Sequence, residues 1–316
     1  MNKPFDTYLG RNPALYGRDI VKALDIKHPP VDENQIADFL GYEIKEIGSE
    51  ETSKWPDIWK LFQIAFAHLF KRENLILLNR EVTPVRRRLG AFHEFGHDLL
   101  PWHTGLDFAC SDTAITPIFH QFIEKEAFAC GSEIMMPGDL FIPDILSLPL
   151  SISAIKALAS RYDASLEATA IRYARINPSI CSLVIAEPAE NQKSQYIDHG
   201  HRSPGQLIFP FKLPSTQVRL EDEKKYPLKV KYSVKSHRFP RFIRPGTGIE
   251  EGNPIFEAWD SGRPVQAEIP ASVFGSTTKW VYNAECLPLG KSGMVLVLLW
   301  LPDHQAKLEF ENGVIS

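Results

Sequence analysis

The chain has 316 residues, roughly twice the 150 residues of a typical domain, so we expect two domains or one domain with a large extension. Hydrophobic residues make up 44% of it and charged residues 23%, which is typical of a soluble globular protein and excludes a disordered, collagen-like or disulfide-stapled chain. The net charge of -4 excludes a bulk nucleic-acid coat protein, although local basic patches remain compatible with it.

The spacing of the cysteines and the length of the apolar runs indicate the cellular compartment in which the protein is expected. Cys110, Cys130, Cys181 and Cys286 are far apart and form no CxxC pair, which argues against a disulfide framework and against a thiolate zinc site. The longest apolar run, 294–301, has eight residues, whereas a membrane helix needs ~20. We therefore expect a cytoplasmic protein without an export signal or a membrane helix.

Helix signals dominate the first 40 residues. Two helices are predicted within residues 18–40, separated by the stop at His28-Pro29-Pro30. Asp32 is a residue type that commonly caps the N-terminus of a helix, here the second one, and Gly41 is a residue type that commonly ends a helix.

Strand and helix patterns alternate after Gly41. Apolar and charged residues alternate over 42–47, which predicts a half-buried strand, whereas the apolar density of 57–71 predicts a helix. A short strand is predicted over 74–79. Thr83 and Pro84 then fit the start of a helix that runs to about Leu100, before Pro101.

Further helices precede a β-rich region. They are predicted over 117–135, 153–162 and 166–175. From Ile180 onward, short β-rich runs are separated by proline and glycine, and the loosest stretch places a domain boundary near 191–215. No internal repeat is visible.

The strongest chemical signal is His93-Glu94-Phe95-Gly96-His97, an HExxH motif. Histidines four residues apart lie on one helix face and can bind the same metal ion. A catalytic zinc ion normally has three protein ligands, and the two histidines would supply two of them. Glu94 can reach a water at the remaining open position and take its proton. The motif therefore indicates hydrolysis of a peptide bond.

Chance alone places such a pentapeptide in roughly one chain in a hundred of this length, so its context matters. The motif lies deep in a predicted helix, follows a short strand able to align an extended peptide, and precedes a helix rich in acidic residues. We expect a metal site rather than a coincidental surface pair.

The third ligand must come from another element, and the helix over 117–135 offers four candidates: His120, Glu124, Glu126 and Glu133. Glu124 and Glu126 are about 200° apart around a helix, so only one of them can face the metal. Periodicity narrows the choice without deciding it.

A family resemblance adds to this interpretation. The order PPVDENQIADFLGYEI, NLILLN, RRRLGAFHEFGHDLL and IEKEAFACGSEIMMP resembles the ImmA/IrrE family of zinc metallopeptidases over roughly residues 18–190. In that family the third ligand is the glutamate three residues before the alanine of an E-x-x-A-N-x-F-A block, which places it on Glu124. The sequence departs from this pattern at Phe128, where the family has asparagine, and at Cys130, where it has phenylalanine. Pro101-Trp102 displaces the usual following histidine, which leaves His103 as a candidate for its equivalent.

The resemblance implies a cytoplasmic enzyme that binds Zn²⁺ through His93, His97 and Glu124 and uses Glu94 as general base. It also implies a helix-turn-helix transcriptional repressor as the protein substrate, whose cleavage switches on stress-response or mobile-element genes. Nothing in the spacing or composition identifies that substrate. For the group that stabilises the oxyanion, His103, His120 and Tyr162 are candidates.

Residues 155–176 resemble a helix-turn-helix unit, with Asp163 where glycine is more common. Four basic residues against two acidic ones give this segment a net charge of +2, which is weak support for DNA binding. We favour a packing role for it over direct contact with DNA.

The C-terminal region resembles a GAF-like sensor domain in its glycine-bearing helix segment, GIEEGNPIFEAWDSG, and in its final strands. Its aromatic core candidates are Phe256, Trp259, Trp280 and Trp300. Residues 212–244 hold ten basic and three acidic residues, which fits either an anion site or a solvated, lysine-guarded edge strand. On the strand over 229–235, lysines are expected on one face and Val230, Tyr232 and Val234 on the other.

Taken together, the sequence predicts an α+β fold. It consists of a zincin-like metallopeptidase domain over 1–150, a helix-turn-helix-like unit with its following strand over 151–190, and a GAF-like domain over 205–316, where a small-molecule effector would bind. The predicted function is a soluble regulatory zinc endopeptidase. The competing class is a DNA-binding or ligand-sensing regulator with a structural metal site and no proteolysis. Three protein ligands plus water would indicate catalysis, whereas four protein ligands would indicate a structural site.

Overall fold

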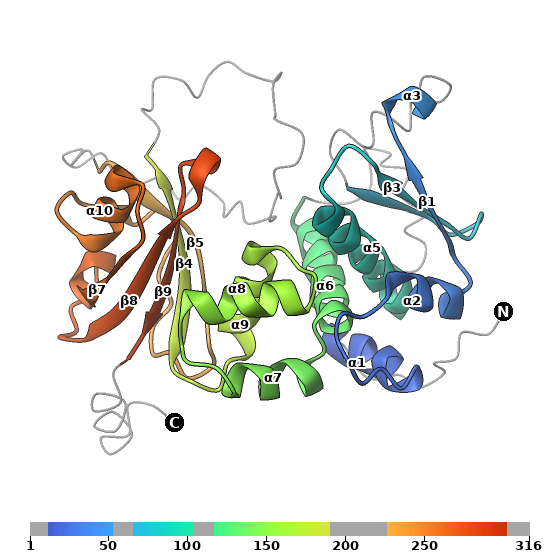
Figure 1. The fold of residues 1–316 in the computed structure, drawn as a ribbon, viewed down its shortest axis with the longest axis horizontal. Coiled ribbons are helices and arrows are strands. Elements are labelled where there is room, and N and C mark those ends of the chain that lie inside the picture. Colours follow the sequence, from blue (N-terminus) through green and yellow to red (C-terminus); the bar gives the residue numbers. More distant parts are fainter. Residues whose placement is uncertain (1–11, 53–65, 104–116, 190–225, 302–316) are drawn as a thin grey trace. The chain divides into compact units, whose positions relative to one another are not determined.

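The computed structural model describes residues 12–52, 66–103, 117–189 and 226–301, and it confirms a mixed α+β fold (Figure 1). The chain divides into two compact units. The first includes the residues up to Phe141 and the segment Ala159–Ser165, and the second includes Ile142–Leu158 and the described residues from Leu166 onward.

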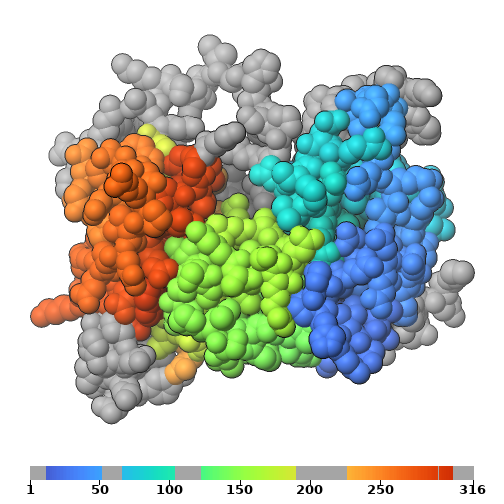
Figure 2. Space-filling view, viewed as in Figure 1, coloured from blue at the N-terminus to red at the C-terminus, as the bar shows by residue number. Residues whose placement is uncertain are grey.

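The first unit begins with two helices, α1 (Pro13–Ala23) and α2 (Glu33–Leu40), and α1 starts before the predicted residue 18. The Asp32 side chain accepts a hydrogen bond from the backbone N–H of Asn34 at 2.9 Å, so it caps α2 as expected. Gly41 ends the helix with φ 81°, a left-handed conformation that favours glycine. Figure 2 shows these helices, in blue, as part of the outer surface of the unit.

Three short strands form the sheet of the first unit, in the order β1-β3-β2. β1 (Glu43–Ile47) pairs in parallel with β3 (Leu75–Asn79), and β2 (Ala67–Phe70) pairs antiparallel with the other side of β3. β3 is therefore the central strand, and β2 lies at one edge of the described sheet.

The helix predicted over 57–71 is wrong at its C-terminal end, because residues 67–70 form β2. An apolar run without clear periodicity fits a buried helix and a buried strand equally well. Here the pairing of residues 67–70 with β3 selects the strand. Residues 57–65 of that prediction lie outside the described residues.

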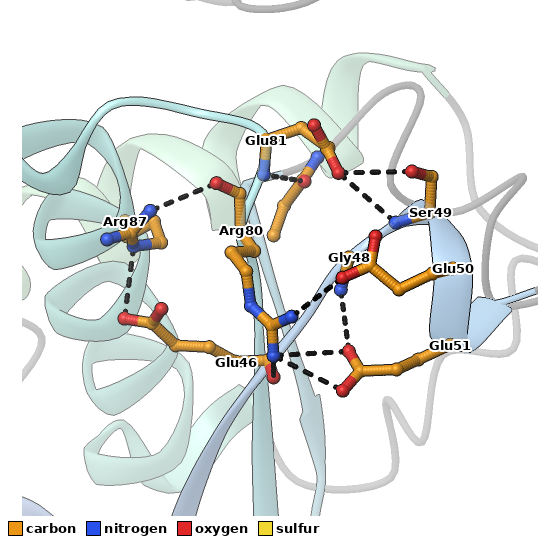
Figure 3. Close-up of polar contacts among 9 residues, drawn as sticks. Glu46, Gly48, Ser49, Glu50, Glu51, Arg80, Glu81 and Arg87 are labelled. Atoms are coloured by element: carbon orange, nitrogen blue, oxygen red, sulfur yellow. Dashed lines mark hydrogen bonds and ion pairs between the residues drawn. The ribbon is translucent and has the colours of Figure 1, made fainter.

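Charged side chains connect the ends of β1 and β3 to the start of α5 (Figure 3). Arg80, just after β3, forms ion pairs with Glu50 and Glu51 of α3 (Ser49–Thr52) at 3.1 and 3.2 Å. Arg87 of α5 pairs with Glu46 of β1 at 3.1 Å. Water screens these partly exposed groups and weakens each pair. The pairs of Arg80 link the end of β3 to α3, and the pair of Arg87 links α5 to β1.

The two predicted helices that carry the motif and the third-ligand candidates are confirmed as α5 (Pro84–Leu99) and α6 (Pro117–Met135), with a short 3-10 turn, η1 (Pro101–His103), after α5. α5 and α6 pack so closely that a Cβ added at Gly96 would lie 2.3 Å from the Ala127 carbonyl oxygen. A Cβ at Gly131 would lie 2.4 Å from the Phe92 carbonyl oxygen. One glycine from each helix thus sets the distance between them.

Three helices follow: α7 (Gly138–Leu146), α8 (Ile152–Arg161) and α9 (Leu166–Ile176). Asp163, between α8 and α9, has φ 47°, which agrees with the glycine usually found there. α9 packs against β4 and β5. Its residues 169–174 are buried, so most of this helix offers no exposed face to DNA, and the packing role is supported.

The second unit contains a six-stranded sheet in the order β6-β5-β4-β9-β8-β7, antiparallel throughout. The strands are β4 (Cys181–Pro188), β5 (Leu228–Lys235), β6 (Gly248–Ile249), β7 (Val265–Pro270), β8 (Val281–Pro288) and β9 (Val295–Trp300). The helical elements among them are α10 (Pro254–Ser261), η3 (Ala271–Phe274) and η4 (Gly290–Ser292). α10 packs on β7, β8 and β9.

β4 lies between β5 and β9, in the interior of this sheet (Figure 1). The sheet therefore takes a strand from the N-terminal side of the boundary expected near 191–215. Counted from β4 and without the two-residue β6, the strand order is 2-1-5-4-3. Phe256, Trp259 and Trp280 pack against the apolar core of the sheet, as expected of core aromatics.

A β-bulge in the β4–β5 pair changes the expected alternation along β5. The register shifts between Ile185 and Ala186, which pair with Tyr232 and Val230. Val230 belongs to the apolar core, whereas the Tyr232 hydroxyl donates to Glu167 of α9. The prediction that Val230 and Tyr232 share one face is therefore wrong, because an extra residue in a strand breaks the two-residue period. No helix among the described residues has the length and apolarity needed to cross a membrane.

Candidate metal centre

α5 and α6 bring three potential metal ligands together. His93 and His97 lie one helical turn apart on α5, and their Nε2 atoms are 3.0 Å from each other. Glu124 of α6 places one carboxylate oxygen 3.1 Å from Nε2 of His93 and the other 3.4 Å from Nε2 of His97. Among the described residues, these three are the group of His, Cys, Asp and Glu side chains arranged to hold a metal ion.

The spacing of these atoms fits zinc. Bonds of about 2.0–2.1 Å in a tetrahedral centre place neighbouring ligand atoms about 3.3 Å apart, and the separations here are 3.0, 3.1 and 3.4 Å. Two imidazoles and one carboxylate are also a ligand set that zinc commonly uses. The described residues supply three ligands, which leaves one tetrahedral position open.

Burial and mutual contacts shift the pKa values of the three groups. Burial lowers the pKa of His97 to about 4, which keeps this imidazole neutral. Burial also acts to lower the pKa of His93, but its hydrogen bond to Glu124 and the charges of Glu124 and Glu94 outweigh this and raise it. Burial acts to raise the pKa of Glu124, but its contacts with the two histidines hold it well below its usual range. Glu124 is therefore an anion at neutral pH, as a metal ligand must be.

Glu94 lies next to the histidines but contacts a different element. Its carboxylate accepts a hydrogen bond from the backbone N–H of Leu69 in β2. Burial raises the pKa of Glu94 to about 7, against the opposing charge of His93. A carboxyl group with a pKa near 7 can both accept and donate a proton at neutral pH.

Glu126 does not face the histidine pair directly, which agrees with the expectation that only one of Glu124 and Glu126 can do so. Its carboxylate accepts a hydrogen bond from Nε1 of Trp102 at 2.7 Å and lies 3.1 Å from Nε2 of His103. The other ring nitrogen of His103, Nδ1, is 3.2 Å from Nδ1 of His97. A connection thus runs from Glu126 through His103 to His97.

The surroundings of His93 are different. The Phe128 ring packs against its imidazole in a tilted arrangement, with centroids 4.1 Å apart. Nδ1 of His93 is buried and has no hydrogen-bond partner among the described residues. Phe128, which stands where the family pattern has asparagine, therefore gives His93 an apolar neighbour.

The remaining candidates lie elsewhere. Glu133 accepts a hydrogen bond from the backbone N–H of Gly138 at 2.9 Å, away from the histidine pair. Tyr162 is fully buried, with its ring against Phe141. The side chain of His120 lies outside the described residues. The contact of Glu94 with β2 and the hydrogen bonds of His103 were not predicted, because both depend on how distant segments pack.

In the second unit, the described lysines of β5 have partners. Lys229 and Lys231 lie 3.7 and 3.6 Å from the two carboxylate oxygens of Glu187 on β4, and Lys235 donates to the Phe239 carbonyl at 2.8 Å. These contacts favour the solvated strand face over an anion site at these lysines. Lys212 and its neighbours up to residue 225 lie outside the described residues.

Comparison with known proteins bears on the first unit. Residues 60–173 match the peptidase family model described as the IrrE N-terminal-like domain, and this segment contains His93, Glu94, His97 and Glu124. The match supports the resemblance to the ImmA/IrrE family. It indicates a regulatory, metallopeptidase-type family for this part of the chain. A comparison with curated proteins gives no match.

Among solved structures, one titled "Mycobacterium tuberculosis transcriptional regulator" is similar to this chain with a TM-score of 0.56. The two are 12% identical, and the similarity covers 96% of this chain and 80% of that chain. At this identity the likeness shows a shared fold and carries no function by itself.

Proposed function

We propose that this protein is a regulatory zinc endopeptidase that cleaves a helix-turn-helix transcriptional repressor. The observation that carries the proposal is the convergence of His93, His97 and Glu124, with separations of 3.0–3.4 Å between ligand atoms and with Glu94 beside them. The family match over residues 60–173 supports the peptidase class.

In this proposal His93, His97 and Glu124 hold the metal. Bound zinc would act as a Lewis acid toward the scissile carbonyl and lower the pKa of a water to about 7. Three protein ligands with an open fourth position are typical of catalytic sites, whereas structural zinc usually has four protein ligands.

Glu94 moves the proton. Its carboxylate accepts a proton from the attacking water and then donates it to the nitrogen of the leaving amine. Burial raises the pKa of this group to about 7, which suits both roles at neutral pH. The Leu69 N–H holds one side of the carboxylate and so fixes its orientation.

β2 is suited to align the substrate backbone. It pairs with β3 on one side only among the described strands, and the Leu69 N–H that reaches Glu94 points away from β3. The outward edge of β2 therefore runs past Glu94, and an extended peptide can add to it as a further strand. The sequence assigned this role to the strand over 74–79, but that strand is β3, whose two edges are both paired.

The second unit is proposed to be GAF-like and to bind a small-molecule effector that alters peptidase activity. Its support is an independent antiparallel sheet with its own apolar core and with α10 packed on β7–β9. An effector can change the activity only by binding two states of the protein with different affinities.

The competing function is a DNA-binding or ligand-sensing regulator with a structural metal. A solved structure with a similar fold is that of a transcriptional regulator, and the similarity covers 96% of this chain, although at 12% identity it shows the fold alone. The three-ligand cluster and the burial of most of α9 favour the peptidase.

The deciding experiment combines the purified protein with a helix-turn-helix repressor encoded beside its gene. We expect zinc-dependent cleavage at one position, which a chelator stops and added zinc restores. DNA binding without cleavage of any such repressor, in protein shown to contain zinc, would favour the regulator instead.

A further inference from the structure

We propose that Glu126 and His103 form a positioning pair that orients His97 toward the metal. This inference rests on the proposed metal site and adds two residues that act through a ligand rather than as ligands. Its basis is the connection from the Glu126 carboxylate to His103 and from His103 to His97, with separations of 3.1 and 3.2 Å.

The direction of each hydrogen bond follows from the ligand role of His97. To bind a metal through Nε2, a neutral imidazole must carry its proton on Nδ1. Nδ1 of His97 therefore donates to Nδ1 of His103, which must be without a proton. The proton of His103 is then on Nε2 and is donated to Glu126. Each donor meets an acceptor, and only one tautomer of each ring fits.

Burial makes this pair specific. His103 is 1% exposed, so water does not replace its partners, and the Glu126 side chain is 29% exposed. Nε1 of Trp102 donates to the same carboxylate at 2.7 Å and so holds the Glu126 side chain in place as the acceptor for His103. η1, which follows directly after α5, places Trp102 and His103 beside α6.

This arrangement gives His103 a different role from stabilising the oxyanion. Its Nδ1 faces His97 and its Nε2 faces Glu126, so neither ring nitrogen is available to a substrate carbonyl. Groups that hydrogen-bond to the far nitrogen of a metal-bound histidine fix the orientation of that histidine and increase its basicity. Loss of such a group typically costs 10–100-fold in metal affinity.

The test is zinc affinity, measured by competition with a chromogenic chelator, together with the visible spectrum of the cobalt-substituted protein. We expect His103→Leu to weaken zinc binding 10–100-fold and to change the cobalt spectrum. His103→Asn should recover most of the affinity, because the asparagine Oδ1 takes the place of Nδ1 and accepts from His97.

Glu126 provides the second arm and remains available if His103→Leu does not fold, because its side chain is partly exposed. Glu126→Ala should weaken zinc binding about 10-fold in the otherwise wild-type protein. It should add nothing in the His103→Leu background, because Glu126 acts through His103. Glu133→Gln is the matched control, because Glu133 is a buried acid on the same helix whose carboxylate contacts the Gly138 N–H and Arg18. This variant should keep wild-type zinc affinity even if stability falls.

Three outcomes overturn the inference while leaving the metal site intact: wild-type zinc affinity in both His103→Leu and Glu126→Ala, equal losses in His103→Leu and His103→Asn, or additive losses in the double variant. Absence of zinc and cobalt binding by the wild-type protein would instead overturn the proposed metal site and this inference together. Thermal unfolding of each metal-free variant separates a loss of fold from a loss of affinity.

Discussion

The two units of this protein bury their polar groups in different ways. In the first, His93, His97 and Glu124 point at one another from two helices, with separations of 3.4 Å or less. In the second, buried hydroxyl groups such as those of Ser182 and Ser236 bond to backbone groups beside an apolar core, and Lys231 and Glu187 pair near the strand surface.

The contrast indicates where the chemistry lies. Burying several titratable groups together costs stability, so a cluster of this kind is a candidate functional site, where a ligand or a reaction uses the groups. Buried hydroxyl groups that bond to the backbone, an apolar core and paired charges near the surface are what stability alone requires. We therefore expect changes in the first unit to alter metal binding and cleavage, and changes in the described part of the second unit to alter mainly stability.

The largest effect is expected from Glu94→Gln. Cleavage should fall by about 10²–10⁴-fold, because glutamine cannot accept the proton of the attacking water. Zinc content, measured by atomic emission, should stay that of the wild type. Glu81→Gln, at a carboxylate outside the site, serves as control. Loss of zinc along with activity would assign Glu94 to the coordination shell.

Next comes the pair Glu124→Ala and Glu126→Ala. Removing a direct ligand should reduce zinc affinity more than 100-fold, whereas removing Glu126 should cost about 10-fold. Both are measured by chelator competition on protein of equal thermal stability. Equal losses, or a larger loss from Glu126→Ala, would contradict the assignment of the third ligand.

A smaller effect, on stability and metal together, is expected from Gly96→Ala. The added methyl group would lie 2.3 Å from the Ala127 carbonyl oxygen, so α5 and α6 must separate, at a cost of about 3 kcal/mol in the free energy of unfolding. Zinc affinity should fall as well, because Glu124 moves away from both histidines. In Gly48→Ala, the added methyl would meet only flexible glutamate ends at 3.3 Å or more, so urea denaturation should show little change.

The smallest effect is expected in the second unit. Tyr232→Phe removes the hydroxyl that donates to Glu167 and should lower the free energy of unfolding by about 1 kcal/mol. Lys231→Ala, which breaks a partly exposed pair with Glu187, should cost less. Zinc affinity should be unchanged in both variants. A clear loss of zinc affinity in Tyr232→Phe would contradict the expectation that changes in the second unit alter mainly stability.

Local signals predicted much of the fold. Asp32 and Gly41 define the ends of α2 through hydrogen bonds and a backbone conformation that depend on neighbouring residues only. The HExxH spacing likewise fixes which side chains share a face of α5, whatever the rest of the chain does.

Contacts between residues far apart in the chain could not be predicted from the sequence. The apolar residues of β2 fit a helix and a strand equally well, and only the pairing with the neighbouring β3 decides between these two structures. For the same reason Glu126 and His103, 23 residues apart, gave no sequence sign of their contact. The β5 bulge, which turns Tyr232 toward α9, is also set by its partner strand.

The interior position of β4 has a consequence for synthesis of the chain. β4 is complete at residue 188, but β9, its partner on one side, is complete only at residue 300, which is 300 − 188 = 112 residues later. At about 5–20 residues per second, the nascent chain carries an apolar strand with at least one open edge for roughly 6–22 seconds. Such an edge can pair with another nascent chain. We therefore expect the yield of folded protein to depend on translation speed and on chaperones that bind exposed strands.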